Sequence, residues 1–399
     1  MMGESRWDRR SLQENCCKQG KPVQHTLLSE GIRSVTIDNA TFSDAFRNPD
    51  IARALVRDIE QAAVTPMRLM EVCGTHTMAI FRHGIRGLLP PTITLLSGPG
   101  CPVCVTDTLD INAFIALSQQ DGVTVATFGD LMRVPGSFTS LRQEVAEGAD
   151  VRVVYSAMDA VALAQRHPDR TVVFLGVGFE TTAPTVAAAV LTARDRGVTN
   201  FCVYSAHKVV PPALDALMTA PDTRIDGFLL PGHVSVIIGT EAYRPFFQQF
   251  GKPCVVAGFE PLDILEAVRR LAHQITSGRP QLTNAYSRAV SDVGNPLARR
   301  VMETVFAPCD ARWRGLGIIP GSGLAIRPEL AAFDAARRFN IAVVEMPEPK
   351  GCLCGPVLTG ARQPTDCPLF GKRCTPMDPV GPCMVSNEGS CAAFYRYFK

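Results

Sequence analysis

From about residue 50, short apolar runs alternate with longer stretches in which apolar residues recur at helical spacing. Continuous apolar strands separated by helices are typical of parallel sheets buried on both faces. The pattern therefore predicts an α/β protein with two parallel-sheet α/β units that divide near Glu147–Asp150. The predicted strands are Thr92–Leu96, Val123–Phe128, Val151–Tyr155, Thr171–Val177, Phe201–Tyr204, Gly227–Leu230 and Cys254–Ala257. Helical patterns lie between them, as in Thr108–Gln119, Ala157–Gln165, Thr182–Arg196 and Pro261–Ile275.

The two ends of the chain lack this alternation of apolar strands and helices. Residues 1–30 show no apolar period and include the adjacent pair Cys16 and Cys17, which we interpret as incidental. After about residue 345 the chain is rich in Gly, Pro and Cys and has too few apolar residues to form a core. A segment of this kind needs a disulfide bond or a bound metal to hold its structure. We therefore predict an N-terminal extension (1–30), a first α/β domain (31–150), a second with connecting helices (151–340) and a small Cys-rich iron–sulfur domain (341–399).

The charge and the lengths of the apolar runs indicate which classes of partner the protein can have. The 399 residues include 40 Lys plus Arg and 38 Asp plus Glu, giving a formal net charge of +2. Phosphate binding needs clustered positive charge, so this balance argues against nucleic acid as the main partner. No apolar run approaches the roughly 20 residues of a membrane span, and the polar N-terminus lacks the apolar core of a signal peptide. We expect a cytoplasmic protein without a membrane span.

Six of the fourteen cysteines gather near the C-terminus. In a reducing compartment, clustered cysteines indicate metal binding or redox chemistry, and four thiolates suit either a zinc ion or an iron–sulfur cluster. Their spacing is neither that of a zinc ribbon nor that of a bacterial ferredoxin. We favour an iron–sulfur cluster with four of the cysteines as ligands, which leaves two for a redox-active disulfide. The alternative is a structural zinc ion with two cysteines unused. The six are Cys352, Cys354, Cys367, Cys374, Cys383 and Cys391.

A second group of cysteines lies in the first α/β unit. Cys73 and His76 have CxxH spacing, and Cys101 and Cys104 have CxxC spacing after a Gly-Pro-Gly turn. Together these spacings would suit zinc. The CxxC pair equally suits a dithiol that cycles through a disulfide. The turn follows the strand Thr92–Leu96, at the carboxyl edge where open α/β sheets bind ligands.

A glycine turn follows another predicted strand and opens a helix. Gly176, Gly178, Thr181 and Thr182 could present backbone amides to a small anion. The segment lacks the third glycine of a dinucleotide fingerprint and the Gly-Lys-Ser/Thr of a P-loop, so a structural turn is an equal alternative. We interpret His207 and His233 as core or turn histidines. The single cysteines Cys202, Cys254 and Cys309 are expected to be small buried hydrophobes.

Several of these segments, in order along the chain, resemble the hydrogenase maturation family HypD. They are EVCGTHT (Glu71–Thr77), SGPGCPVCV (Ser97–Val105), TFGDLMRVPG (Thr127–Gly136), GFETTAPT (Gly178–Thr185), LPGHVSVIIGT (Leu230–Thr240), VVAGFEPLDIL (Val255–Leu265), WRGLG (Trp313–Gly317) and the C-terminal cysteine block. The resemblance implies an assembly scaffold for the Fe(CN)2CO unit of [NiFe] hydrogenase, with the large subunit of that enzyme as an indirect partner. It further implies a HypC-type chaperone, a HypE-type donor of cyanide, and a redox-active accessory role rather than that of a metabolic enzyme.

The same resemblance assigns roles to individual residues. Independently of the resemblance, His76 lies close enough to Cys73 in the sequence to act as a ligand, to orient the site or to donate a proton, and we favour the orienting role. The resemblance implies that Cys73 holds the iron under construction and that Cys101 and Cys104 form a redox pair. It implies a [4Fe–4S] cluster on Cys367, Cys374, Cys391 and either Cys352 or Cys354, with the remaining one paired to Cys383. We take Cys352 as the ligand and Cys354 with Cys383 as the pair. We hypothesise that electrons pass from the cluster through this pair to Cys101 and Cys104.

Two other functions fit the residues. The first is a thiol–disulfide oxidoreductase of the ferredoxin:thioredoxin reductase type, in which no second iron binds. The second is a structural zinc protein with α/β binding domains.

Overall fold

A computed structural model describes residues 46–220, 224–343 and 347–397, and the elements below all belong to one compact unit, Pro49–Lys399. The predicted α/β class is confirmed. Each of the seven predicted strands and four predicted helices is present, with ends that differ by no more than two residues from the expected ones. The adjacent cysteines Cys16 and Cys17, which we interpret as incidental, lie outside the described residues.

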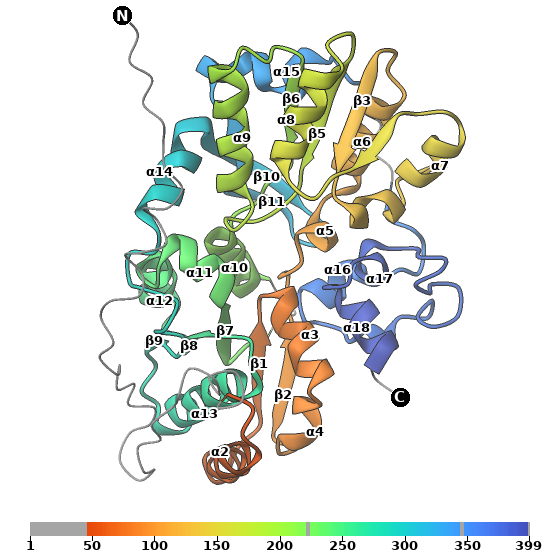
Figure 1. Cartoon of the computed structure of the whole chain (residues 1–399). Helices are drawn as coiled ribbons and strands as arrows, with labels where there is room; N and C mark the ends of the chain where they lie inside the picture. Colours follow the sequence, from red (N-terminus) through yellow and green to blue (C-terminus); the bar gives the residue numbers. More distant parts are fainter. Residues whose placement is uncertain (1–45, 221–223, 344–346, 398–399) are drawn as a thin grey trace, which may run out of the picture. The chain divides into compact units, whose positions relative to one another are not determined.

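The larger sheet has five parallel strands in the order β2-β1-β7-β8-β9. It joins strands that are far apart in the sequence, because β1 and β2 precede β7 by more than a hundred residues (Figure 1). Its strands are β1 (Met67–Glu71), β2 (Ile93–Ser97), β7 (Gly227–Pro231), β8 (Cys254–Ala257) and β9 (Leu282–Asn284).

The second sheet is contiguous in sequence and has four parallel strands in the order β4-β3-β5-β6. Here β3 pairs with both β4 and β5, so the expected break near Glu147–Asp150 does not separate the two sheets. The chain instead leaves the larger sheet after β2 and returns to it at β7. The four strands are β3 (Val123–Thr127), β4 (Val151–Val153), β5 (Thr171–Gly176) and β6 (Phe201–Ser205).

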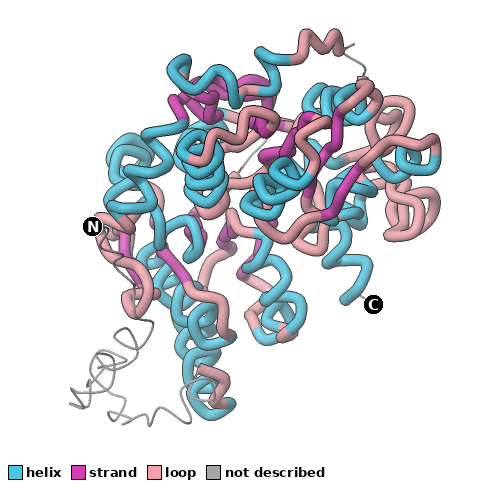
Figure 2. Tube along the Cα trace, turned by 45° about the horizontal axis from the view of Figure 1, so that its top comes forward, coloured by secondary structure: helices cyan, strands magenta, loops and turns pink. Residues whose placement is uncertain are grey.

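Helices cover both faces of the four-stranded sheet, as the continuous apolar strands require. Alternate residues of β5 face opposite ways: Val172 and Phe174 pack with α8 (Ala157–Arg166) and α9 (Ala183–Asp195), whereas Val173 and Leu175 pack on the other side. That other side is covered by α6 (Thr108–Ser118), α7 (Leu141–Ala146) and α15 (Ala335–Arg338). In Figure 2 the strands lie between helices in this way.

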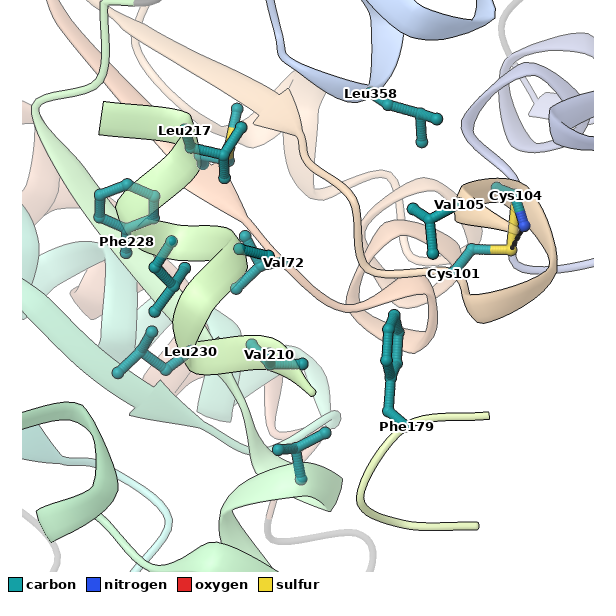
Figure 3. Packing of buried hydrophobic residues seen from close by; sticks show 14 of the residues in the cluster. Val72, Cys101, Cys104, Val105, Phe179, Val210, Leu217, Phe228, Leu230 and Leu358 are labelled. Carbon is teal, nitrogen blue, oxygen red and sulfur yellow. Dashed lines mark hydrogen bonds between the residues drawn. A yellow bond between two sulfur atoms is a disulfide. The ribbon is translucent and has the colours of Figure 1, made fainter. Parts of the chain in front are cut away.

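The five-stranded sheet is also covered on two sides. One face packs against α13 (Pro261–Ser277), which in turn packs against α2 (Pro49–Ala62). The other carries the largest apolar cluster, in which Phe228 and Leu230 meet Val210 and Leu217 (Figure 3). The helices on this side are α10 (Val210–Thr219), α11 (Gly232–Ile238) and α12 (Arg244–Phe250). This cluster extends to Cys101, Cys104 and the C-terminal cysteines, so one core supports both cysteine groups.

The antiparallel hairpin of β10 (Phe306–Trp313) and β11 (Gly317–Ile326) is an element that the sequence pattern did not predict. The remaining helices are α3 (Gly74–Arg82), α4 (Ile85–Leu88), α5 (Pro102–Val105), α14 (Pro296–Val305), α16 (Cys354–Leu358), α17 (Pro382–Val385) and α18 (Ser390–Tyr397). In the part of the chain that the structure describes, 3₁₀ helices span Gly129–Arg133, Glu241–Tyr243, Pro328–Phe333 and Pro364–Asp366. Among the described residues, no helix is long and apolar enough to cross a membrane.

Candidate functional site

The two N-terminal cysteine motifs meet at the carboxyl edge of the five-stranded sheet. Glu71 and Ser97 are register partners at the ends of β1 and β2, so the loops that follow leave the sheet side by side. The backbone N–H of Gly74 donates to the carbonyl of Gly100 over 2.9 Å. A Cβ on Gly100 would collide with the backbone nitrogen of Cys73, so only glycine permits this approach. The structure thus brings Cys73 next to the turn that carries Cys101.

Cys73 lies at the start of α3 and is buried. Burial raises the pKa of its thiol to about 12, and the nearby backbone N–H groups of His76 and Thr75 partly offset this rise. The nearby carboxyl groups of Glu388 and Glu71 raise the pKa further. The free thiol therefore stays protonated, and a bound cation is the natural substitute for that proton.

The side chain of Glu71 stabilises the loop that carries Cys73 through two hydrogen bonds. Its side chain is fully buried and accepts hydrogen bonds from the Thr77 hydroxyl over 2.7 Å and from the Cys73 backbone N–H over 3.3 Å. Burial raises the pKa of the Glu71 carboxyl to about 8. The carboxyl group links the end of β1 to the first turn of α3, which fixes the position of Cys73 between them.

His76 ties the Cys73 loop to strand β8. Its Nε2 lies 2.9 Å from the carbonyl oxygen of Gly258 and 3.2 Å from that of Ala257. Since both partners are acceptors, we assign the proton to Nε2. Its Nδ1 is then an acceptor, and it is buried without a partner among the described residues. Burial lowers the pKa of His76 to about 4, so the ring is neutral.

Cys101 and Cys104 are bonded to each other as a disulfide, with their Cα atoms 5.2 Å apart. Proline at the first position of α5 starts the short helix that faces the two sulfurs toward each other, and the Cys104 N–H donates to Cys101 Sγ over 3.2 Å (Figure 3). Both residues are buried. This arrangement favours the thiol–disulfide interpretation of the CxxC pair over a zinc site shared with Cys73 and His76.

Five of the six C-terminal cysteines line one small pocket. They share it with apolar side chains that include Leu369, Phe370 and Met384. The five are Cys352, Cys354, Cys367, Cys374 and Cys391. Cys383 does not line this pocket, but it is fully buried and its thiol interacts with those of Cys354 and Cys391. The four predicted cluster ligands therefore share a pocket, and the predicted pair Cys354 and Cys383 is in contact.

The donor chemistry of this pocket suits an iron–sulfur cluster, because its donors are thiols. Within residues 46–220, 224–343 and 347–397, no three His, Cys, Asp or Glu side chains are arranged to hold one metal ion. In a [4Fe–4S] cluster each thiolate binds a different iron, so the sulfurs need not converge on one point. Val380 N–H donates to Cys374 Sγ over 3.3 Å, and such amide contacts stabilise a thiolate ligand. The pocket could hold a cluster through Cys352 or Cys354 together with Cys367, Cys374 and Cys391.

The cysteine block is attached directly to both N-terminal motifs. The Thr75 hydroxyl donates to the Glu388 carboxylate over 2.8 Å, and Gly74 leaves no space between its Cα and the Glu388 side chain. In Figure 1 α18 lies beside α3 and α17 beside α5, and both pairs are in contact. Cys383 on α17 and Cys104 on α5 thus belong to adjoining helices.

Glu388 is a site residue that our sequence reasoning did not single out. Its carboxyl is largely buried, and burial raises its pKa. The signal available was an acidic residue inside a block of Gly, Pro and Cys, between Cys383 and Cys391. Charged residues are rarely buried unless they have partners, so the carboxyl group of Glu388 requires a specific hydrogen-bond donor. Thr75 is that donor.

The glycines of the turn before α9 allow neighbouring side chains to pack closely against the backbone. A Cβ on Gly176 would meet the ring of His207, and one on Gly178 would collide with the side chain of Thr182. The amides of Thr182 and Ala183 already donate to the carbonyl of Phe179, over 2.9 and 3.1 Å. An anion at this turn would have to compete with that carbonyl, which favours the structural alternative over the anion site predicted at Gly176, Gly178, Thr181 and Thr182.

The single cysteines and histidines follow the expectations in most cases. Cys202 and Cys254 are fully buried, whereas Cys309 is only half-buried. His207 is buried, with its Nδ1 3.0 Å from the Ser205 hydroxyl oxygen. His233 is exposed and stacks on Phe259, with ring centroids 3.9 Å apart.

Glu180 lies in the same turn and is almost completely buried. Its Oε1 accepts a hydrogen bond from the backbone N–H of Val210 over 2.9 Å, while Oε2 has no partner among the described residues. Burial raises the pKa of the Glu180 carboxyl from 4.5 to about 7. The group therefore binds a proton in the folded state over a pH range in which the unfolded chain has released it.

Replacing Glu180 with Gln is expected to remove part of the pH dependence of stability. Between pH 4.5 and about 7 the folded state holds more protons at this site, so the free energy of unfolding falls as pH rises, by up to about 1.4 kcal/mol per pH unit. Urea unfolding at pH 5 and pH 7 should show Glu180→Gln gaining about 2 kcal/mol relative to the wild type across this interval. The variant Glu329→Gln, at an exposed position, controls for the loss of one carboxyl group. An equal pH dependence in Glu180→Gln and wild type would contradict the prediction.

Comparison with known proteins agrees with this arrangement. A family model described as "HypD: Hydrogenase formation hypA family" matches residues 50–398. The chain is 45% identical to the hydrogenase maturation factor HypD of Rhizobium leguminosarum bv. viciae, covering 89% of this chain and 95% of the relative. It is also 45% identical to HypD of Escherichia coli K12, covering 89% and 98%, and 44% identical to HypD of Cupriavidus necator, covering 89% and 97%. The motifs, their contacts and these matches agree: the chain belongs to the HypD family of hydrogenase maturation factors.

Proposed function

We propose that the chain is the scaffold on which the Fe(CN)2CO unit of [NiFe] hydrogenase is assembled, together with a HypC-type chaperone and a HypE-type cyanide donor. The observation that carries the proposal is the backbone contact between the Cys73 loop and the disulfide turn at Gly100. A metal-holding thiol and a redox pair then share one site. The finished unit is cargo, which reaches the hydrogenase large subunit indirectly.

In this proposal Cys73 holds the iron that is being built. Iron(II) with cyanide and carbonyl ligands suits a soft thiolate, and the iron takes the place of the thiol proton. The backbone N–H groups of Thr75 and His76 stabilise the thiolate. His76 has an orienting role, because its ring is bonded to the carbonyls at the end of β8 and holds the first turn of α3 in place.

Cys101 and Cys104 would supply the electrons that free cyanide from a thiocyanate carried by the donor. In the reduced form the two thiols lose two electrons and two protons and become the disulfide. The thiocyanate gains them, its S–C bond breaks, and the products are the donor's thiol and hydrogen cyanide. The disulfide between Cys101 and Cys104 is the oxidised end of this reaction.

The reduced pair would be restored by thiol–disulfide exchange with Cys354 and Cys383. In this exchange their two thiols become a disulfide, and Cys101 and Cys104 become thiols. The contact of α17 with α5 supports an exchange between these two pairs. We assign the cluster ligands as Cys352, Cys367, Cys374 and Cys391, with Cys354 as the alternative to Cys352. When bound, a [4Fe–4S] cluster would exchange single electrons with the neighbouring sulfurs.

A thiol–disulfide oxidoreductase without a second iron site is the competing function, favoured by the same disulfide and its contact with the cysteine block. Anaerobic purification of the chain with a HypC-type partner, followed by infrared and Mössbauer spectroscopy, separates the two. Assembly predicts CO and CN stretching bands and two kinds of iron. A brown sample without diatomic bands would support the oxidoreductase, and a colourless sample with zinc would refute both.

A further inference from the structure

The cysteine block has a second cavity on its outer side, distinct from the pocket of five cysteines. This cavity, of about 690 Å³, is lined by Cys352 and Cys354 and by two arginines from separate segments, Arg314 and Arg362. Its volume is within the range of small-molecule sites. The inferred scaffold function makes no use of it, nor of the WRGLG motif that contains Arg314.

Arg314 is held rigidly at the wall of this cavity by the turn between β10 and β11. Its backbone N–H donates to the carbonyl of Val105 over 3.0 Å, and its Nε donates to the carbonyl of Thr106 over 3.2 Å. The neighbouring Gly315 touches Gly355, where a Cβ on Gly315 would collide with the Gly355 Cα. The hairpin turn is therefore built against the Cys352–Cys354 segment, with Arg314 between that segment and α5.

The Arg314 side chain still lacks one hydrogen-bond acceptor. Only 3% of it is exposed, and its Nη1 binds both oxygens of Glu348, at 2.8 and 2.6 Å. Its Nη2 has no partner among the described residues. A buried guanidinium N–H without an acceptor is costly, and because the other nitrogens are already bonded the group cannot turn away. Its partner Glu348 is about half exposed, so an anionic oxygen that enters the cavity would compete with the Glu348 carboxylate for the Arg314 guanidinium.

Charge points to the same kind of ligand. Arg362 is exposed and forms no ion pair with any other described residue, whereas Glu348, the one carboxylate among the described lining residues, is already paired with Arg314. The described part of the lining therefore has one positive charge in excess. We propose that this cavity binds a small anion with a carboxylate or oxyanion group, held by Arg314 and Arg362 beside Cys352 and Cys354.

Isothermal titration calorimetry of the anaerobically purified full chain tests this site, with sodium sulfate and sodium acetate as probes at constant ionic strength balanced by sodium chloride. We expect saturable one-site binding of at least one probe. Tighter binding of sulfate would identify an oxyanion site, and tighter binding of acetate a carboxylate site. The readout is independent of hydrogenase maturation, so the inference can fail while the proposed function stands, and the reverse.

Two variants decide whether the cavity is responsible. Arg362→Gln, at an exposed position, is expected to weaken binding about tenfold through loss of one charge-assisted contact. Glu348→Gln is expected to tighten binding, because it removes a competing carboxylate from Arg314. Arg373→Gln is the matched control, since Arg373 is exposed in the same block but does not line the cavity. Absence of saturable binding, or an equal loss in Arg362→Gln and Arg373→Gln, would overturn the proposal.

Discussion

Replacing Cys73 with Ala is expected to abolish the CO and CN stretching bands of the anaerobically purified complex. In the proposed assembly this sulfur is the protein ligand to the iron, whereas the adjacent Cys101 and Cys104, which form a disulfide with each other, have a redox role. The brown colour and the acid-labile sulfide should remain, since the C-terminal cysteines form a separate pocket. Infrared spectroscopy and sulfide analysis on the same sample measure the two outcomes.

Cys202→Ala is the control for this experiment. Cys202 is also fully buried, and it packs in the core of the four-stranded sheet rather than at the strand edge. Both substitutions remove one buried sulfur, so their effects on packing should be similar. Diatomic bands of normal intensity in Cys73→Ala would refute the assignment of the iron to this residue. Their loss in both variants would instead indicate a general effect on folding.

Cys101→Ala and Cys104→Ala are each expected to prevent cyanide loading almost completely while leaving iron bound at Cys73. Neither remaining thiol can form the intramolecular disulfide, so the two electrons for cleaving the thiocyanate S–C bond are not delivered as a pair. The double variant should be no worse than either single variant, because the two sulfurs act as one unit. The intensity of the CN bands per Cys73-bound iron is the quantity to measure.

Cys254→Ala provides the matched control, because this cysteine is fully buried in the same apolar cluster as Cys101 and Cys104 but lies at the start of β8, away from the carboxyl edge of the sheet. It should load cyanide as the wild type does. Full cyanide loading in Cys101→Ala or Cys104→Ala would remove the redox role of the pair and leave the disulfide a structural one.

Local pattern predicted the strands well, because β-branched apolar runs such as Thr171–Val177 are both intrinsically extended and buried on two faces. Strand β1 was missed, since Arg68 and the buried Glu71 interrupt its apolar run. The partition of strands between the sheets was wrong for a different reason. Pairing of β1 with β7 depends on contacts between segments far apart in the sequence, and the local periodicity of apolar residues contains no information on such contacts.

For the candidate site, spacing identified the thiols but not their neighbours. The CxxC motif and the strand edge predicted where Cys101 and Cys104 lie, and the structure places them there. The close approach of Gly100 to Cys73 and the bond from Thr75 to Glu388 could not be predicted, because each depends on how separate elements pack. The roles of the cysteines themselves stay predictions.

The order of strands in the larger sheet has a consequence during protein synthesis. Strands β1 and β2 leave the ribosome early, but β1 has no second neighbour until β7 has been made, more than a hundred residues later. At ordinary rates of translation this delay is on the order of ten seconds. For that time an apolar strand edge and the Cys73 thiol beside it are uncovered, so a nascent chain stalled between β2 and β7 should be the form most dependent on chaperones and most prone to oxidation.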